Sequence, residues 1–288
     1  MAPGVIPVRI SPSRPAHRTG AVRPFRQEDI ISTRIALVGG GASGIGYATA
    51  GQLLQAGHRV VITGRHLDRL EAAAARLGEG AAGPVDYLVH DISDLKSAEA
   101  LVREVEIRHG ALDVLVLNAG GPPPGGILRV DDDQWQAAFD LLLRGPLRMA
   151  RAALPEMAAR GFGRVVFVTS TAVRQPQPDL AASVVLRSAV TAAAKLLSRE
   201  YAADGVTVNC VAPGATATER RTLVLRNRAA GAESTYEDLE AADAASIPAG
   251  RPGQPEEIGA AVAFLASPAA GYINGTVLTV DGGRTETI

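Results

Sequence analysis

Short runs rich in β-branched and other apolar residues alternate along this chain with longer stretches rich in alanine and leucine. The short runs, which we predict to be strands, lie at 34–38, 59–63, 85–90, 113–117, 164–169, 206–211 and 276–280. The long stretches, which we predict to be helices, include 44–56, 67–77, 95–109, 131–160, 180–203 and 255–266. The short runs lack polar–apolar alternation, as strands do when helices bury both faces of a parallel sheet.

This alternation of strand and helix predicts an α/β fold in which right-handed crossovers join parallel strands. We therefore expect a Rossmann-type doubly wound parallel sheet of about seven strands, arranged as a three-layer sandwich. The 288 residues suit one large domain, which we place at 31–288. Residues 1–30 are rich in proline and arginine and contain no acid before Glu28, so we interpret them as an N-terminal extension. A transit peptide is the alternative, although the prolines oppose an amphipathic helix.

Two segments interrupt the alternation. The run of glycine and proline at 120–126 follows the fourth predicted strand and is predicted to be a loop. The segment 218–250 follows the sixth strand and is long, charged and rich in alanine. Since long insertions at the carboxyl end of a strand are often functional, we interpret this segment as a substrate lid. A helical excursion that only packs on the domain is the alternative.

Composition and charge narrow the class of partner. A net charge of −1 and an aromatic content of 4% argue against binding of nucleic acid or of an anionic membrane. The single cysteine, Cys210, lies in an apolar run, so we expect a buried thiol and no intrachain disulfide. The sequence offers no membrane-length apolar run, no secretory signal and no metal-ligand spacing. We expect a small-molecule substrate and a cytoplasmic location.

A glycine-rich segment at 39–46 follows the first predicted strand and opens the first predicted helix. Gly40, Gly44 and Gly46 have the spacing Gly-x-x-x-Gly-x-Gly, with Ser43 and Ile45 among them. Glycine permits the tight turn and lets backbone N–H groups approach a pyrophosphate at the N-terminus of the helix. The segment therefore predicts a dinucleotide-binding turn.

The end of the second predicted strand indicates which dinucleotide binds. An acid that selects the ribose 2′-hydroxyl is expected about 20 residues after the glycines. The stretch 61–66 contains no acid. Arg65 lies there instead and is suited to a 2′-phosphate, which it can bind with two parallel hydrogen bonds. We therefore expect NADP, with NAD as the alternative if Arg65 only stacks on the adenine or faces solvent.

Further motifs follow in order at the ends of the later strands. They are Asp91 after the third strand, Asn118-Ala-Gly120 after the fourth, Pro213-Gly214 after the sixth and then Thr218, with C-terminal runs at 251–257, 264–267, 272–275 and 281–283. Over residues 34–283 this series resembles the short-chain dehydrogenase/reductase family. The resemblance implies the strand order 3-2-1-4-5-6-7 and a homodimer or homotetramer.

The resemblance also implies a set of cofactor contacts. The matching residues are Gly40, Ser43, Gly44, Ile45, Gly46, Arg65, Asp91, Ile92, Asn118, Gly120, Arg187, Pro213, Gly214 and Thr218. In that family the residue at the position of Asp91 contacts the adenine. The residue at the position of Thr218 meets the nicotinamide carboxamide.

The same family transfers hydride with the help of a serine, a tyrosine, a lysine and an asparagine. Ser170, at the end of the fifth predicted strand, resembles the serine. The tyrosine position, thirteen residues later, is Ser183, and counting back from Asn209 gives the same register. The lysine position is Arg187 and the asparagine position is Leu142. One of the four family residues is kept.

These replacements change the chemistry that the site can perform. A serine hydroxyl is a much weaker acid than a phenol, whose pKa is about 10. Arg187 can hydrogen-bond a ribose and supply positive charge, but it does not relay protons as a lysine does. We interpret Ser170, Ser183 and Arg187 as a redesigned catalytic site.

The predicted function is that of an atypical NADP-dependent oxidoreductase, acting on a small carbonyl, enone or iminium substrate. One alternative is a non-redox enzyme on the same fold, such as an isomerase, cyclase or lyase. The other is a protein that senses the cofactor.

Three other polar residues are candidates for a part in the chemistry. Asp179 is expected to cap the helix that follows it, with proton transfer as the alternative. Tyr236, in the predicted lid, is a less favoured substitute acid. Lys195 lies two turns beyond Arg187, about 12 Å along the helix axis, which is too far to replace the lysine. We interpret it as a solvated or interface residue.

Overall fold

The computed structural model describes residues 33–80, 85–231 and 234–287, so the predicted extension at 1–30 lies outside the described residues. Parallel strands form one seven-stranded sheet in the order β3-β2-β1-β4-β5-β6-β7. The strands are β1 (Ile35–Gly39), β2 (Arg59–Gly64), β3 (Asp86–Val89), β4 (Val114–Leu117), β5 (Gly163–Val168), β6 (Val206–Pro213) and β7 (Val277–Val280). The predicted doubly wound parallel sheet and its strand order are confirmed.

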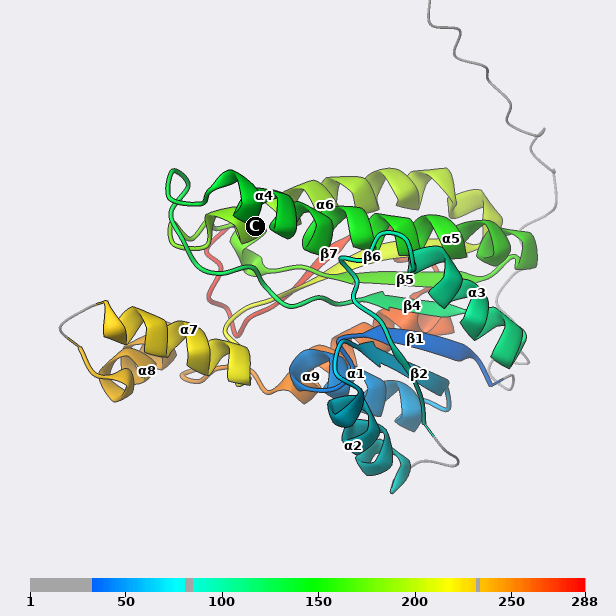
Figure 1. Ribbon diagram of the computed structural model, residues 1–288, viewed down its shortest axis with the longest axis horizontal. Coiled ribbons are helices and arrows are strands. Elements are labelled where there is room, and N and C mark those ends of the chain that lie inside the picture. The colour runs from blue at the N-terminus through cyan, green and yellow to red at the C-terminus, as the bar shows by residue number, and fades with distance from the viewer. Residues whose placement is uncertain (1–32, 81–84, 232–233, 288) are drawn as a thin grey trace, which may run out of the picture.

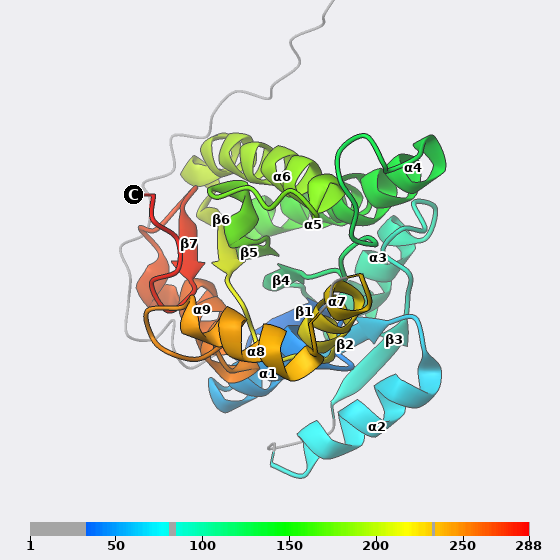
Figure 2. The ribbon, with the colours of Figure 1, turned by 90° about the vertical axis from the view of Figure 1, so that its left-hand side faces the viewer.

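Helices cover both faces of the sheet and make three layers. They are α1 (Gly44–Gln55), α2 (Leu67–Gly78), α3 (Ala98–His109), α4 (Asp132–Phe139), α5 (Gly145–Arg160), α6 (Ala181–Glu200), α7 (Glu219–Ala230), α8 (Tyr236–Ala245) and α9 (Pro255–Ala266). Figure 1 shows α3, α5 and α6 above the sheet and α1, α2 and α9 below it, and Figure 2 shows the same layers from the side.

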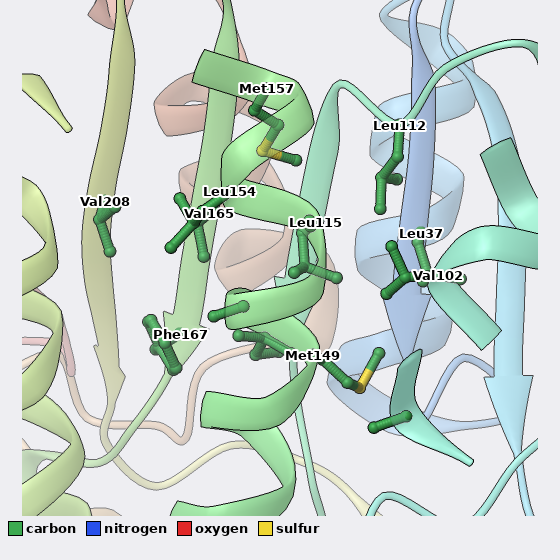
Figure 3. Close-up of a cluster of buried hydrophobic side chains, with 14 of the residues drawn as sticks. Leu37, Val102, Leu112, Leu115, Met149, Leu154, Met157, Val165, Phe167 and Val208 are labelled. Atoms are coloured by element: carbon green, nitrogen blue, oxygen red, sulfur yellow. The ribbon is translucent and has the colours of Figure 1, made fainter. Parts of the chain in front are cut away.

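Two hydrophobic clusters fill the spaces between the sheet and its helices. On one face, Leu115 and Phe167 of the strands pack with Met149 of α5 (Figure 3). On the other face, Ile62 of β2 packs with Leu53 of α1. Successive strand residues point to opposite faces, and both faces are covered. The central strands therefore bury every position, which explains why their sequences show no polar–apolar alternation.

The stretch 131–160, predicted as one helix, is divided by a π-helical turn, η2 (Asp140–Arg144), between α4 and α5. At Gly145, just after this turn, an added Cβ would lie 1.8 Å from the carbonyl oxygen of Ile92. The close approach to that loop explains the glycine, and π turns of this kind are frequent near functional sites. Leu142 lies in the turn and packs against Ala182 and Leu186 of α6.

The segment 218–250 contains α7 and α8, which lie to one side of the layered body at the left of Figure 1. Arg221 of α7 forms ion pairs of 3.0 Å with Glu240 and 2.9 Å with Asp243, both on α8. Asp243 also accepts a 2.8 Å hydrogen bond from Arg284 near the C-terminus. The two helices are therefore held to each other and to the C-terminal segment by charge.

Among the described residues, α6 is the one helix whose length and composition would allow it to cross a membrane. It contacts β6 and the π turn and buries Leu186 and Val190 in the protein. Core helices of soluble proteins pass the same test, so α6 is weak evidence for a membrane span.

Candidate functional site

A cavity of about 840 Å³ opens beside the carboxyl ends of β1, β4, β5 and β6. In doubly wound folds, ligands bind in this crevice, where the strand order reverses between β1 and β4. The predicted site residues that line it are Gly40, Ser43, Gly44, Ile45, Arg65, Asp91, Ile92, Asn118, Gly120, Ser170, Ser183, Arg187, Pro213, Gly214 and Thr218. Gly46 is buried and does not line the cavity. The fold thus brings the predicted cofactor and chemical residues into one space.

The glycine-rich turn leads from β1 into α1 in a conformation suited to an anion. Gly40 has a φ of +62°, which L side chains rarely adopt. A Cβ on Gly46 would lie 2.1 Å from the carbonyl oxygen of Gly40, so the turn closes only with glycine there. Ser43, the N-cap of α1, makes no side-chain capping bond. The first N–H groups of α1 therefore keep their capacity to bind a phosphate.

The ends of β2 and β3 form the opposite end of the cavity. Arg65 and Arg69 are exposed and line it, and neither takes part in an ion pair among the described residues. Asp91 accepts hydrogen bonds from Ser93, of 2.9 Å from the backbone and 2.7 Å from the hydroxyl. Burial opposes ionisation of Asp91, but these bonds and the charge of Arg65 outweigh it and hold its pKa below the usual value.

Thr218 lies between β6 and α7 and borders the glycine-rich turn. Its methyl carbon is 3.4 Å from where a Cβ of Gly44 would be. Its hydroxyl accepts a 3.3 Å hydrogen bond from the backbone of Arg221 and so caps α7. The residue therefore joins the glycine-rich turn to the start of the predicted lid.

Ser170 and Ser183 both line the cavity, Ser170 after β5 and Ser183 in the first turn of α6. The Ser170 hydroxyl accepts a 3.1 Å hydrogen bond from the backbone of Ala172. The Ser183 hydroxyl accepts a 3.2 Å hydrogen bond from Nε of Arg187. Since each oxygen accepts from the protein, each hydroxyl proton remains available as a donor to a ligand.

Arg187 lies one helical turn after Ser183, and backbone carbonyls hold its guanidinium in place. Nη1 donates to the Val168 oxygen at 2.7 Å, and Nη2 donates to the Ala119 oxygen at 3.3 Å. No carboxylate among the described residues pairs with it. Loss of hydration, with a smaller effect from the charge of Arg220, lowers the pKa of Arg187 from 12.5 to about 10. Arg187 is therefore a fixed cation at neutral pH.

Among the described residues that line the cavity, the tyrosine and histidines belong to elements other than the helix of Ser183. The lining includes one tyrosine, Tyr47, two histidines, His66 and His90, and no lysine or cysteine. Tyr47 belongs to α1, and the two histidines follow β2 and β3 at the Arg65 end. Proton donation next to Ser183 thus has no phenol or ammonium to draw on.

The expectation that Asp179 caps α6 is wrong. The N-cap of α6 is Leu180, and no side chain caps this helix. The Asp179 carboxylate accepts a 2.8 Å hydrogen bond from Nε of Arg228 on α7. The sequence pattern did not predict that these two residues are close. This ion pair ties the loop before α6 to the predicted lid.

Tyr236 and Lys195 do not line the cavity. The Tyr236 hydroxyl donates to Glu240, one turn along α8, at 3.2 Å. Lys195 is exposed and donates to the carbonyl oxygen of Gly275 at 3.1 Å. Cys210 is buried as expected, and burial raises the pKa of its thiol to about 12. None of the three reaches Ser183.

Arg220 is a cavity residue that sequence reasoning missed. It lies in the first turn of α7, lines the cavity and donates to the carbonyl oxygen of Pro122 at 2.6 Å. The sequence signal that could have indicated this residue is its position two residues after Thr218, where the predicted lid begins. The contact with the 120–126 loop depends on tertiary packing and has no local pattern.

The chain is similar in sequence to known proteins. Residues 40–285 match the family model described as Enoyl-(Acyl carrier protein) reductase. The chain is 35% identical over 250 residues to 3-oxoacyl-[acyl-carrier-protein] reductase of Haemophilus influenzae, covering 87% of this chain and 97% of that one. It is 34% identical over 259 residues to human dehydrogenase/reductase SDR family member 4, covering 89% of each.

A solved structure is similar over the same span. A variant of actinorhodin polyketide ketoreductase, solved with NADPH, superposes with a TM-score of 0.85 at 33% sequence identity. The match covers 88% of this chain and 98% of that one. The relatives named here are reductases or dehydrogenases, and the solved one contains NADPH.

Proposed function

Because the chain belongs to the short-chain dehydrogenase/reductase family, we propose that it is an NADP-dependent oxidoreductase with an atypical active site. Its substrate is a small carbonyl, enone or iminium compound. The observation that carries the proposal is the single cavity shared by the glycine-rich turn and by Ser170, Ser183 and Arg187.

The residues present fit a dinucleotide phosphate. The uncapped N-terminus of α1 would receive the pyrophosphate, and Arg65 would receive the 2′-phosphate. Arg187 would hydrogen-bond the nicotinamide ribose. When bound in its reduced form, NADP supplies a hydride. The remaining chemistry, the stabilisation of charge on the substrate, falls to the side chains of this chain.

Ser170, Ser183 and Arg187 are suited to stabilise an oxyanion. The two hydroxyls have protons to donate, since their oxygens already accept from Ala172 and Arg187. The Arg187 cation adds a fixed positive charge beside them. Preorganised donors and charge of this kind lower a barrier without having to transfer a proton.

The absence of an acid beside Ser183 favours substrates that need none during hydride transfer. In an enone, hydride adds to the β-carbon and the π electrons move to the oxygen, which gives an enolate that water protonates later. In an iminium ion, hydride neutralises a positive charge and no proton is required. A simple ketone would give a localised alkoxide, which is harder to form without an acid.

A substrate panel tests the proposal. The protein is incubated with NADPH or NADH and with matched ketones, enones and iminium ions, and nicotinamide absorbance is followed under single-turnover conditions. We expect oxidation of NADPH with an enone or iminium ion, slower oxidation with ketones, and a preference for NADPH over NADH. If no class accepts hydride, the oxidoreductase proposal fails.

The pH dependence of turnover follows from the groups in the site. Arg187 has a lowered pKa, but at about 10 it keeps its proton throughout the neutral range and loses it only above that value. Serine hydroxyls do not ionise in this range. We expect kcat to be flat from about pH 7 to about pH 9 and to fall above about pH 10. A kcat profile with a midpoint near neutrality would show that an acid takes part.

The same observation supports a second candidate, a non-redox isomerase, cyclase or lyase that binds NADP without consuming it. Turnover of substrate with no change in nicotinamide absorbance would identify this case. Tight NADPH binding without turnover of any compound would favour the cofactor-sensing alternative. The family resemblance supports a homodimer or homotetramer, and the single cysteine is consistent with the cytoplasm.

A further inference from the structure

Arg220 shares the cavity with the proposed catalytic groups but has no part in the reaction described above. It is half-buried, and Nη2 donates to the Pro122 oxygen at 2.6 Å. A guanidinium carries five N–H donors, so most of the donors of Arg220 remain for a ligand. The side chain therefore offers a planar, charged donor group at the edge of the cavity.

Two other arginines of α7 that line the cavity are paired with acids, and Arg220 is not. Arg221 forms ion pairs with two carboxylates of α8, and Arg228 pairs with Asp179. None of the ion pairs formed within the described residues involves Arg220 or Arg187. Arg65 and Arg69 also line the cavity without an ion pair, but they lie at its other end, whereas Arg187 contacts Ser183 and Arg220 contacts the loop at Pro122.

The cavity as a whole carries excess positive charge. Seven arginines and four carboxylates line it among the described residues. Asp243 is held by Arg221 and Arg284, and Asp91 lies at the far end near Arg65. Glu219 and Glu256 form no ion pair with Arg187 or Arg220. The charge of Arg220 lowers the pKa of Arg187, as expected for like charges that face one space.

Gly121 leaves room for the Arg220 guanidinium. A Cβ at this position would lie 2.8 Å from Nη2 and 3.2 Å from Cζ of Arg220. The guanidinium is the end of a flexible side chain and would move away. Gly121→Ala therefore displaces the charged group without removing it.

We propose that Arg220, together with the charge of Arg187, binds an anionic group of the substrate, a carboxylate or a phosphate. The inference rests on the proposed function and narrows its substrate class to anionic carbonyl, enone or iminium compounds. The pyrophosphate of the dinucleotide is a second anion that Arg220 could bind. The experiment distinguishes it from an anionic group of the substrate.

The test uses binding, so it does not depend on turnover. The full-length protein, saturated with NADP⁺, is titrated calorimetrically with malonate, with inorganic phosphate and with malonamide, the neutral isostere of malonate. We expect malonate or phosphate to bind and malonamide to bind about tenfold more weakly or not at all. Arg220→Gln should weaken anion binding about tenfold or more, whereas Arg220→Lys should keep part of it.

Arg226→Gln is the matched control, because Arg226 is exposed on the same helix, does not line the cavity and carries the same charge. It should leave anion binding unchanged. Gly121→Ala should weaken malonate binding with no change in net charge or melting temperature.

Three outcomes would overturn the proposal. The first is that neither anion binds the wild type. The second is that Arg220→Gln and wild type bind malonate equally. The third is that Arg220→Gln weakens NADP⁺ binding about tenfold while anion binding persists, which assigns Arg220 to the cofactor. Because failure of hydride transfer affects none of these measurements, the inference and the proposed function fail separately.

Discussion

Arg187→Ala is expected to weaken NADPH binding about tenfold or more, which corresponds to about 1.4 kcal/mol or more. The change removes a fixed cation from the cavity and a donor proposed for the nicotinamide ribose. It also leaves the carbonyl oxygens of Val168 and Ala119 without their donor. Each buried unpaired group costs about 1–3 kcal/mol, although removal of a desolvated charge offsets part of this. Calorimetric titration with NADPH measures the dissociation constant, and urea unfolding measures the stability.

Two variants serve as controls for this change. Arg187→Lys keeps the charge and should restore part of the NADPH affinity. Arg226→Ala removes an exposed arginine away from the cavity and should leave the affinity unchanged. An unchanged dissociation constant in folded Arg187→Ala would refute the ribose role.

The double change Ser183→Tyr with Arg187→Lys is expected to raise the reduction of simple ketones about 10²-fold above the parent. General acid catalysis contributes effects of about this size, and a phenol beside a cation is a stronger acid than serine. Ser183 faces a cavity of about 840 Å³, so a larger side chain has space. Single-turnover oxidation of NADPH by an unactivated ketone measures the gain.

Removal of Ser170, the predicted counterpart of the family serine, tests whether the gain uses the same site. Ser170→Ala added to the double variant should abolish most of the new activity, because Ser170 would share the carbonyl oxygen with the tyrosine. A folded double variant with no gain would show that another feature blocks ketone chemistry. Leu142, which packs in one cluster with Ala182 of α6, is then the first position to change to asparagine.

The fold and much of the candidate site could be predicted because their signals are local. Continuous apolar runs marked buried parallel strands, and the glycines at 40, 44 and 46 marked the turn that only small residues can form. The strand ends carried most of the remaining motifs, since parallel strands bring their carboxyl ends to one edge. The assignment of roles to Ser183 and Arg187 remains a prediction, although their i, i+4 contact follows from helical spacing.

The errors have a common physical origin. Asp179 precedes a helix, which favours a cap, but Arg228 from a distant helix takes its carboxylate at 2.8 Å. The stretch 131–160 has continuous helical composition, yet contact between Gly145 and the loop at Ile92 accompanies a π turn within it. In both cases a long-range contact outweighs the local preference.

The sequence by itself determined the alternation of strands and helices and the glycine-rich turn at 39–46, and it predicts a serine and an arginine where the family carries its tyrosine and lysine. These depend on residue type and on spacing along one strand or helix. The tertiary structure decided what surrounds those positions. It placed the carbonyls of β5 and of the loop after β4 around Arg187, and it brought Arg220 across the cavity toward Gly121. Such contacts join residues some 20 to 100 positions apart, and only packing of the whole chain sets their distances.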